Sequence, residues 1–241
     1  MKIKQAIIGA LVCWGASVSI AQAQAQEPGP AAAAIDPLET RSKAIIDRFD
    51  KAIRDCGLSP PYVPTISVST SANLVSYNPA TRVLQQSRWE ELPPAIQGLV
   101  TAWAGAGTLG LSPEQQFGEI FNSLLVPHEL GHYVAVLDGR LAKDDSWTNE
   151  VLANRIAIAF WSLEPEGAAN IADRVANFTG FLNALPNPVP IGQNPRSYFQ
   201  RNYAALGRDP AAYGWFQGAF MTAAWALRDQ DDFCTLVKSA E

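Results

Sequence analysis

Two histidines lie four positions apart in the segment His128-Glu129-Leu130-Gly131-His132, and the chain has no other histidine. On a helix, residues with this spacing share one face, so both imidazoles can reach a single metal ion. A carboxylate that follows the first histidine can take a proton from metal-bound water. The segment therefore predicts metal-assisted hydrolysis, with His128 and His132 as metal ligands and Glu129 as the general base.

A catalytic zinc ion usually has three protein ligands and keeps one position for water. Glu150 follows Asn149 on the next expected helix, which can fold back against the histidine helix and supply the third ligand. Asp138 is the alternative, because it has the spacing of the third ligand in the metzincin pattern H-E-x-x-H-x-x-G-x-x-H/D. However, Ala135 replaces the glycine of that pattern, and the next methionine is as distant as Met221. We favour Glu150 and keep Asp138 open.

The histidine segment and the later Asn-Glu pair together resemble the gluzincin clan of zinc peptidases, the thermolysin-like group. In that clan, H-E-x-x-H is followed by N-E-x-x-S/A-D, and here the resemblance covers residues 128–154. It implies one zinc ion bound by His128, His132 and Glu150, with Glu129 as general base. It also implies that Asn149 and Asn154 support the ligand histidines. Asn154 stands where the clan more often has Asp, and an amide does not raise the basicity of a histidine as a carboxylate would.

The resemblance implies hydrolysis of peptide bonds in a peptide or protein substrate. The oxyanion that forms during such a reaction needs a hydrogen-bond donor besides the metal ion. Because no histidine is left to act as this donor, we expect the donor to be another residue of the C-terminal part. Tyr203 is the first choice, and the alternatives are Tyr198, Tyr213, Arg196 and Arg201.

Two other functions stay open at this point. The chain can be a non-catalytic zincin-like binding module, or a zinc hydrolase that acts on a non-peptide amide or ester. Glu129 favours catalysis over the binding module, because a structural metal site does not need a general base.

The N-terminus has the features of a secretory signal peptide. Lys2 and Lys4 precede an apolar run at residues 6–20, and small residues offer cleavage sites near residues 23–25. We therefore predict a signal peptide at residues 1–23, a flexible linker at residues 24–35, and export to the periplasm or the extracellular space.

Removal of that leader leaves two cysteines, Cys56 and Cys234. An even pair in an exported protein favours a disulfide. The net charge is −5 and no run of Lys or Arg occurs, so we expect no nucleic-acid partner. After cleavage of the leader, we also expect no membrane association.

Residues 36–241 are expected to form one α+β, zincin-like domain with lobes of about residues 36–139 and 140–241. The first lobe would hold a small antiparallel sheet and the active-site helix, and the second would be mostly helical. Alternating apolar residues predict the strands at residues 65–70, 73–77 and 82–86. Helix starts are predicted at Asp36-Pro37, Ser112-Pro113 and Thr148. Pro127 predicts a kink or a new helix immediately before His128.

Overall fold

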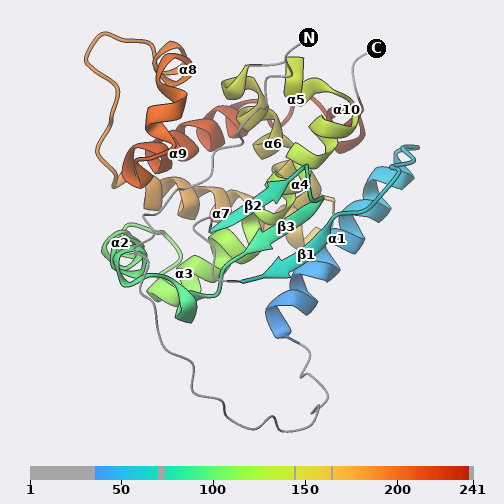
Figure 1. Ribbon diagram of the computed structural model, residues 1–241, viewed down its shortest axis with the longest axis horizontal. Helices are drawn as coiled ribbons and strands as arrows, with labels where there is room; N and C mark the ends of the chain where they lie inside the picture. Colours follow the sequence, from blue (N-terminus) through green and yellow to red (C-terminus); the bar gives the residue numbers. More distant parts are fainter. Residues whose placement is uncertain (1–35, 70–73, 144, 164, 239–241) are drawn as a thin grey trace, which may run out of the picture.

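The computed structural model describes residues 36–69, 74–143, 145–163 and 165–238 (Figure 1). The predicted signal peptide (residues 1–23) and linker (residues 24–35) lie outside this part of the chain. The described segments form an α+β arrangement in which a small sheet precedes a mostly helical part. The elements in chain order are α1 (Pro37–Asp55), β1 (Thr65–Val68), β2 (Val75–Asn78), β3 (Val83–Gln86), the 3₁₀ turn η1 (Trp89–Glu91), α2 (Pro94–Ala104), α3 (Pro113–Glu119), the π-helical turn η2 (Ile120–Leu124), α4 (Val126–Leu137), α5 (Arg140–Lys143), α6 (Ser146–Trp161), α7 (Pro165–Asn183), α8 (Pro195–Leu206), α9 (Pro210–Ala226) and α10 (Phe233–Val237).

The three strands form a mixed sheet in the order β1-β3-β2 (Figure 1). β2 and β3 pair antiparallel as predicted, around a turn in which the Asn78 side chain accepts a hydrogen bond from the Ala80 N–H at 2.9 Å. β1 pairs with β3 in parallel, so the prediction of a wholly antiparallel sheet is wrong. The reason is that β3, rather than β2, takes the central position. Because the chain reverses direction twice between β1 and β3, these two strands run the same way.

Two of the predicted helix starts are confirmed. Asp36 caps α1 by accepting from the Leu38 N–H at 2.9 Å, and Pro37 stands in the first turn, where its missing N–H costs no helical bond. Ser112 caps α3 and forms a reciprocal capping box with Gln115.

The third predicted start, with Thr148 as the N-cap, is wrong by three residues. α6 begins at Ser146, and the side chain of Asp145 accepts from the Thr148 N–H at 2.9 Å. Asp145 is therefore the N-cap, and Thr148 supplies the backbone donor that the cap satisfies. Trp147 therefore lies inside this helix, directly after its first residue.

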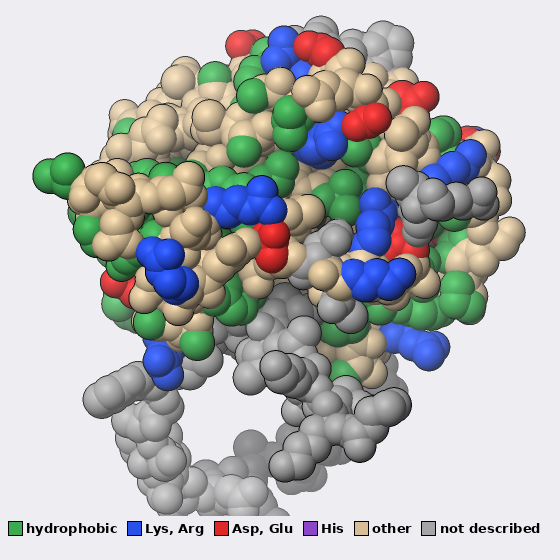
Figure 2. All heavy atoms as spheres, turned by 90° about the horizontal axis from the view of Figure 1, so that it is seen from above, with side chains coloured by type: hydrophobic (Ala, Val, Ile, Leu, Met, Phe, Trp, Pro, Cys, Tyr) green, Lys and Arg blue, Asp and Glu red, His purple; other side chains and the backbone are tan. Residues whose placement is uncertain are grey.

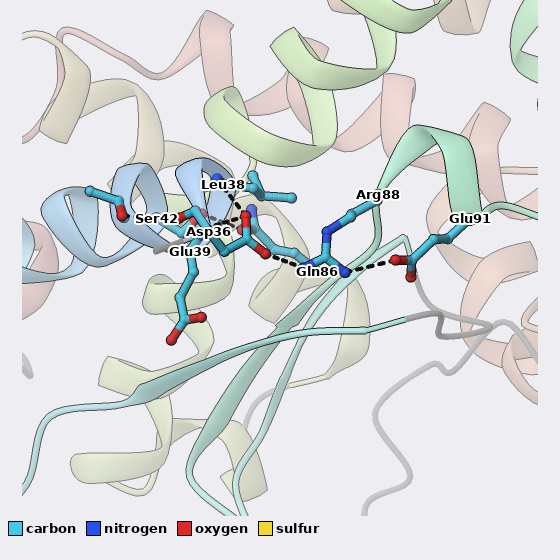
Figure 3. A network of polar contacts seen from close by, with 8 residues as sticks. Asp36, Leu38, Glu39, Ser42, Gln86, Arg88 and Glu91 are labelled. Carbon is cyan, nitrogen blue, oxygen red and sulfur yellow. Dashed lines mark hydrogen bonds and ion pairs between the residues drawn. The ribbon is translucent and has the colours of Figure 1, made fainter. Parts of the chain in front are cut away.

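A polar network holds the start of α1 against the end of β3 (Figure 3). Arg88 forms an ion pair with Asp36 and a second with Glu91 at 2.8 Å. Ser42 donates to the side chain of Gln86, which in turn donates to the Phe121 carbonyl at 3.2 Å. The network thereby joins α1, β3 and the π-helical turn that leads into α4.

The core consists of two hydrophobic clusters that meet at α6. One cluster packs α1, the sheet, α4 and α10 together, and the other packs α2, α3, α7, α8 and α9. Ile156 and Phe160 of α6 belong to the first cluster, whereas Val151 and Ile158 belong to the second. α6 is therefore the helix that both halves of the core share.

The predicted disulfide between Cys56 and Cys234 is confirmed, with a Cα–Cα distance of 5.2 Å. It joins the C-terminus of α1 to α10, across 178 residues of sequence. In the part of the chain that the structure describes, no helix has the length and apolar character that crossing a bilayer requires.

Candidate metal centre

α4 carries both histidines and begins directly after the π-helical turn. Leu125 closes that turn by donating its N–H to the Ile120 carbonyl at 2.9 Å, and α4 starts at Val126. Pro127 therefore lies in the first turn of a new helix, where no backbone bond is lost. This arrangement is one of the two that the sequence predicted, and it places His128 and His132 one turn apart on a buried face.

Three potential ligand atoms converge between α4 and α6. The Nε2 atoms of His128 and His132 are 3.2 Å apart, and Oε2 of Glu150 lies 3.4 Å from the first and 4.0 Å from the second. Ligand atoms of a tetrahedral zinc ion lie roughly 3.3 Å apart, given bonds of about 2.0–2.2 Å. The three residues therefore fit such an ion with only a small adjustment of the Glu150 carboxylate. They are the cluster of described residues that could hold a metal ion.

The centre is withdrawn from solvent. His128, His132 and Glu150 are 3%, 5% and 7% exposed, and no histidine is visible on the face drawn in Figure 2. Buried groups of this kind need partners, because a polar atom removed from water costs free energy unless it is paired. Three ligand atoms that point at one another satisfy this need when a cation lies between them.

Asp138 does not take part in this cluster. It stands at the C-terminal end of α4, where its carboxylate forms an ion pair with the Arg140 guanidinium and accepts from the Arg140 N–H at 2.9 Å. The structure thus brings Glu150, and not Asp138, to the two histidines.

A close helix contact makes this meeting possible. A Cβ atom placed on Gly131 would lie 2.9 Å from the Cα of Ala153, which is closer than carbon atoms approach without a shift. Glycine at this position therefore lets α4 and α6 pack at short range. The contact lies between the two histidines in sequence and beside Glu150, so it sets the distance between the ligands.

Asn154 lies behind His128 and fixes its tautomer. The Asn154 Nδ2 donates to the Glu150 carbonyl at 3.1 Å, which directs its Oδ1 toward Nδ1 of His128, also at 3.1 Å. Nδ1 must then carry the proton, so Nε2 keeps its lone pair for a metal ion. Asn149, the other predicted supporting residue, is buried and donates to the Leu141 carbonyl at 3.4 Å.

Burial and mutual charge shape the protonation of the three groups. Burial alone would raise the pKa of Glu150, but its contact with His128 and the charges of both histidines lower that pKa to about 2. Burial lowers the pKa of His132 to about 4, against the opposing effect of Glu150. Burial lowers the pKa of His128, but the contact with Glu150 and the charges of Glu150 and Glu129 outweigh this effect and raise that pKa. The protein groups themselves therefore favour an ionised Glu150 and a neutral His132, the forms that bind metal ions, whereas His128 would give up a proton more readily when a cation binds.

Glu129 lies next to these groups at the wall of a pocket. Its Oε2 accepts from the Tyr77 N–H of β2 at 2.8 Å, which fixes the carboxylate relative to the sheet. Burial raises the pKa of Glu129 to about 7. A carboxylate with a pKa near neutrality can both accept and return a proton.

The pocket has a volume of about 130 Å³ and mostly apolar walls. Most of the lining residues come from α2, the π-helical turn, α7 and α9. The polar residues that line it are Ser76, His128, Glu129, His132, Glu150, Tyr213 and Gln217. The pocket can thus take up an apolar group beside the converging ligand atoms.

Two residues of α9 extend the site beyond the predicted set. Tyr213 donates its hydroxyl to Oε1 of Glu150 at 3.1 Å, and Gln217 donates to Oε2 at 3.2 Å. Tyr213 is one of the sequence candidates for an oxyanion donor, whereas Gln217 is not among them. The first choice, Tyr203, is not among the described residues that line the pocket. The spacing of Tyr213 and Gln217 by one helical turn was the available clue, but only the packing of α9 shows what they face.

No protein-family model, curated protein or solved structure matches this chain. The resemblance to the gluzincin clan therefore stays a prediction, based on residues 128–154. The same holds for the zincin-like character of the fold.

Proposed function

We propose that this protein is a zinc-dependent hydrolase that cleaves peptide bonds. The observation that carries the proposal is the position of the Glu129 carboxylate, at the edge of a pocket that also holds the ligand atoms of His128, His132 and Glu150. Two histidines and one glutamate are a ligand set of catalytic zinc sites. A site that only stabilised the fold would not need the carboxylate of Glu129.

Each residue of the site has a separate role in the proposed reaction. His128, His132 and Glu150 would hold the zinc ion, which when bound polarises a carbonyl and lowers the pKa of water. Glu129 takes the proton of the attacking water and passes it to the leaving amine, a role that suits its raised pKa. Tyr213 is the sequence candidate for the oxyanion donor that lines this pocket, but its one hydroxyl proton is donated to Glu150, so its part here is to orient that ligand. The apolar walls would receive a side chain of the substrate and exclude water.

We further propose that the protein works after export, in the periplasm or outside the cell. The disulfide between Cys56 and Cys234 supports this, because such bonds persist in oxidising compartments. The predicted signal peptide agrees with the same location.

A hydrolysis assay on a broad peptide library tests the proposal. The zinc-loaded wild type should cleave peptides, and Glu129→Gln should lower kcat/KM by about 10²- to 10⁴-fold while it still binds zinc, because only the proton acceptor is lost. Glu150→Gln should lower the zinc affinity itself. Glu114→Gln, an exposed glutamate on α3, is the matched control and should behave as wild type. A wild type that binds zinc and cleaves no peptide would refute the peptidase and leave a binding module or a hydrolase of other substrates.

A further inference from the structure

Both oxygens of the Glu150 carboxylate receive a hydrogen bond from the same helix. Tyr213 donates to Oε1 and Gln217 donates to Oε2, and these residues lie one turn apart on α9. Glu150 is buried, with 7% of the residue exposed, so solvent contributes little to holding its carboxylate in place. Its orientation therefore depends on the donors that α9 provides.

We propose that Tyr213 and Gln217 form a clamp that fixes Glu150 for metal binding, an inference that rests on the metal centre of the proposed function. The clamp keeps Oε2 turned toward the histidines, at 3.4 Å from Nε2 of His128, and keeps Oε1 turned toward the Tyr213 hydroxyl. Glu150 then offers a single oxygen to the metal ion. Gln217 acts as a positioning residue, since its contact is with the ligand, and Tyr213 combines this role with a place in the pocket.

α9 packs closely on α7 and on Leu185, which follows α7 in the chain. A Cβ on Gly214 would lie 2.8 Å from Cδ1 of Leu185, and a Cβ on Gly218 would lie 3.0 Å from Cβ of Leu182. These glycines directly follow Tyr213 and Gln217 in sequence. The short approach between the helices therefore determines how far the two donors reach toward Glu150.

The clamp residues also form part of the pocket wall. Tyr213 and Gln217 line the same pocket as the ligand atoms, so a substrate group that enters it lies against the clamp. The clamp thus connects the substrate side of the site with the ligand that completes the metal centre.

Zinc affinity, measured by competition with a chelator, tests the clamp. Tyr213→Phe and Gln217→Met remove one donor each at nearly constant volume, and each should weaken zinc binding by about tenfold or more, as the loss of partners behind metal ligands does. The absorption spectrum of the cobalt-loaded protein should change in both variants, because the Glu150 oxygen shifts relative to the ion. Gln217→Asn withdraws the amide by one methylene and should have the same effect, so it replaces Gln217→Met if that variant does not fold.

Two control variants separate the clamp from general effects on α9 and its core. Thr222→Val removes a side-chain bond within α9, and Tyr198→Phe removes a hydroxyl from a ring that stacks on Phe216 of the same helix. Both should keep the zinc affinity and cobalt spectrum of the wild type. The clamp is refuted if the Tyr213 and Gln217 variants bind zinc within about twofold of wild type. A wild type that binds no zinc overturns both proposals, whereas one that binds zinc without cleaving peptides overturns only the peptidase.

Discussion

At the scale of residues, the geometry of the candidate centre depends on the side chains that hydrogen-bond to its metal ligands. Oδ1 of Asn154 accepts a hydrogen bond from the His128 Nδ1–H, and Tyr213 and Gln217 donate to Glu150. Each contact leaves a lone pair directed at the point where the three ligand atoms converge. The geometry of the centre is therefore set in part by hydrogen bonds from Tyr213 and Gln217, which lie outside the motif at residues 128–154.

Asn154 provides a test of this dependence. Asn154→Leu removes the acceptor of the His128 Nδ1–H and leaves a buried donor without a partner, so zinc affinity should fall by about 10- to 100-fold. Asn154→Asp keeps an acceptor and adds a charge that makes the histidine more basic, so it should bind zinc no more weakly than wild type. Chelator competition measures both variants, and equal affinity in Asn154→Leu and wild type would contradict the role.

The sequence predicted this residue-scale arrangement in part. His128, His132 and Glu150 could be named from their spacing along the chain, and Asn154 from the resemblance to the gluzincin motif. Gln217 could not be, because it reaches Glu150 only through the tertiary position of α9. The sequence also favoured Tyr203 over Tyr213, because position along the chain does not tell which tyrosine faces the pocket.

The approach of α4 to α6 decides, at the scale of elements, whether the ligands meet. Gly131 stands at that contact, with the backbone of Ala153 filling the place of a Cβ. Backbone cannot move aside as a flexible side chain can, so a methyl group here must push the helices apart.

Gly131→Ala should therefore destabilise the protein by about 1–3 kcal/mol, as overpacking of a core does, and should weaken zinc binding because Glu150 moves away from the histidines. Denaturant unfolding and chelator competition measure the two effects. Gly118→Ala on α3 is the control, because nothing lies within 4 Å of its added Cβ, and it should be neutral or stabilising. If Gly131→Ala is as stable as wild type and binds zinc equally well, the close contact does not set the site.

Local chemistry made several elements predictable. Asp36 and Ser112 cap helices as expected, because a cap involves only residues a few positions apart. Asn78 likewise marks the turn between β2 and β3. The partner of β1 was beyond such reasoning, since an alternating pattern identifies a strand and its buried face but not its neighbour or direction.

At the scale of the whole molecule, the candidate centre lies where the two hydrophobic clusters meet. α4 belongs to the cluster around the sheet, α9 belongs to the other, and α6 carries Glu150 between them. The disulfide joins α1 to α10 within the first of these clusters. In the chain-entropy model a bridge over so long a loop stabilises by about 5 kcal/mol, which helps to keep the cluster that supports α4 assembled.

The central claim is that His128, His132 and Glu150 hold one zinc ion, and anomalous X-ray scattering at the zinc edge tests it most directly. Crystals of the zinc-loaded protein should show one strong peak about 2.0–2.2 Å from Nε2 of both histidines and from one oxygen of Glu150. An ion bound instead by Asp138, or no ion at the two histidines, would contradict the account.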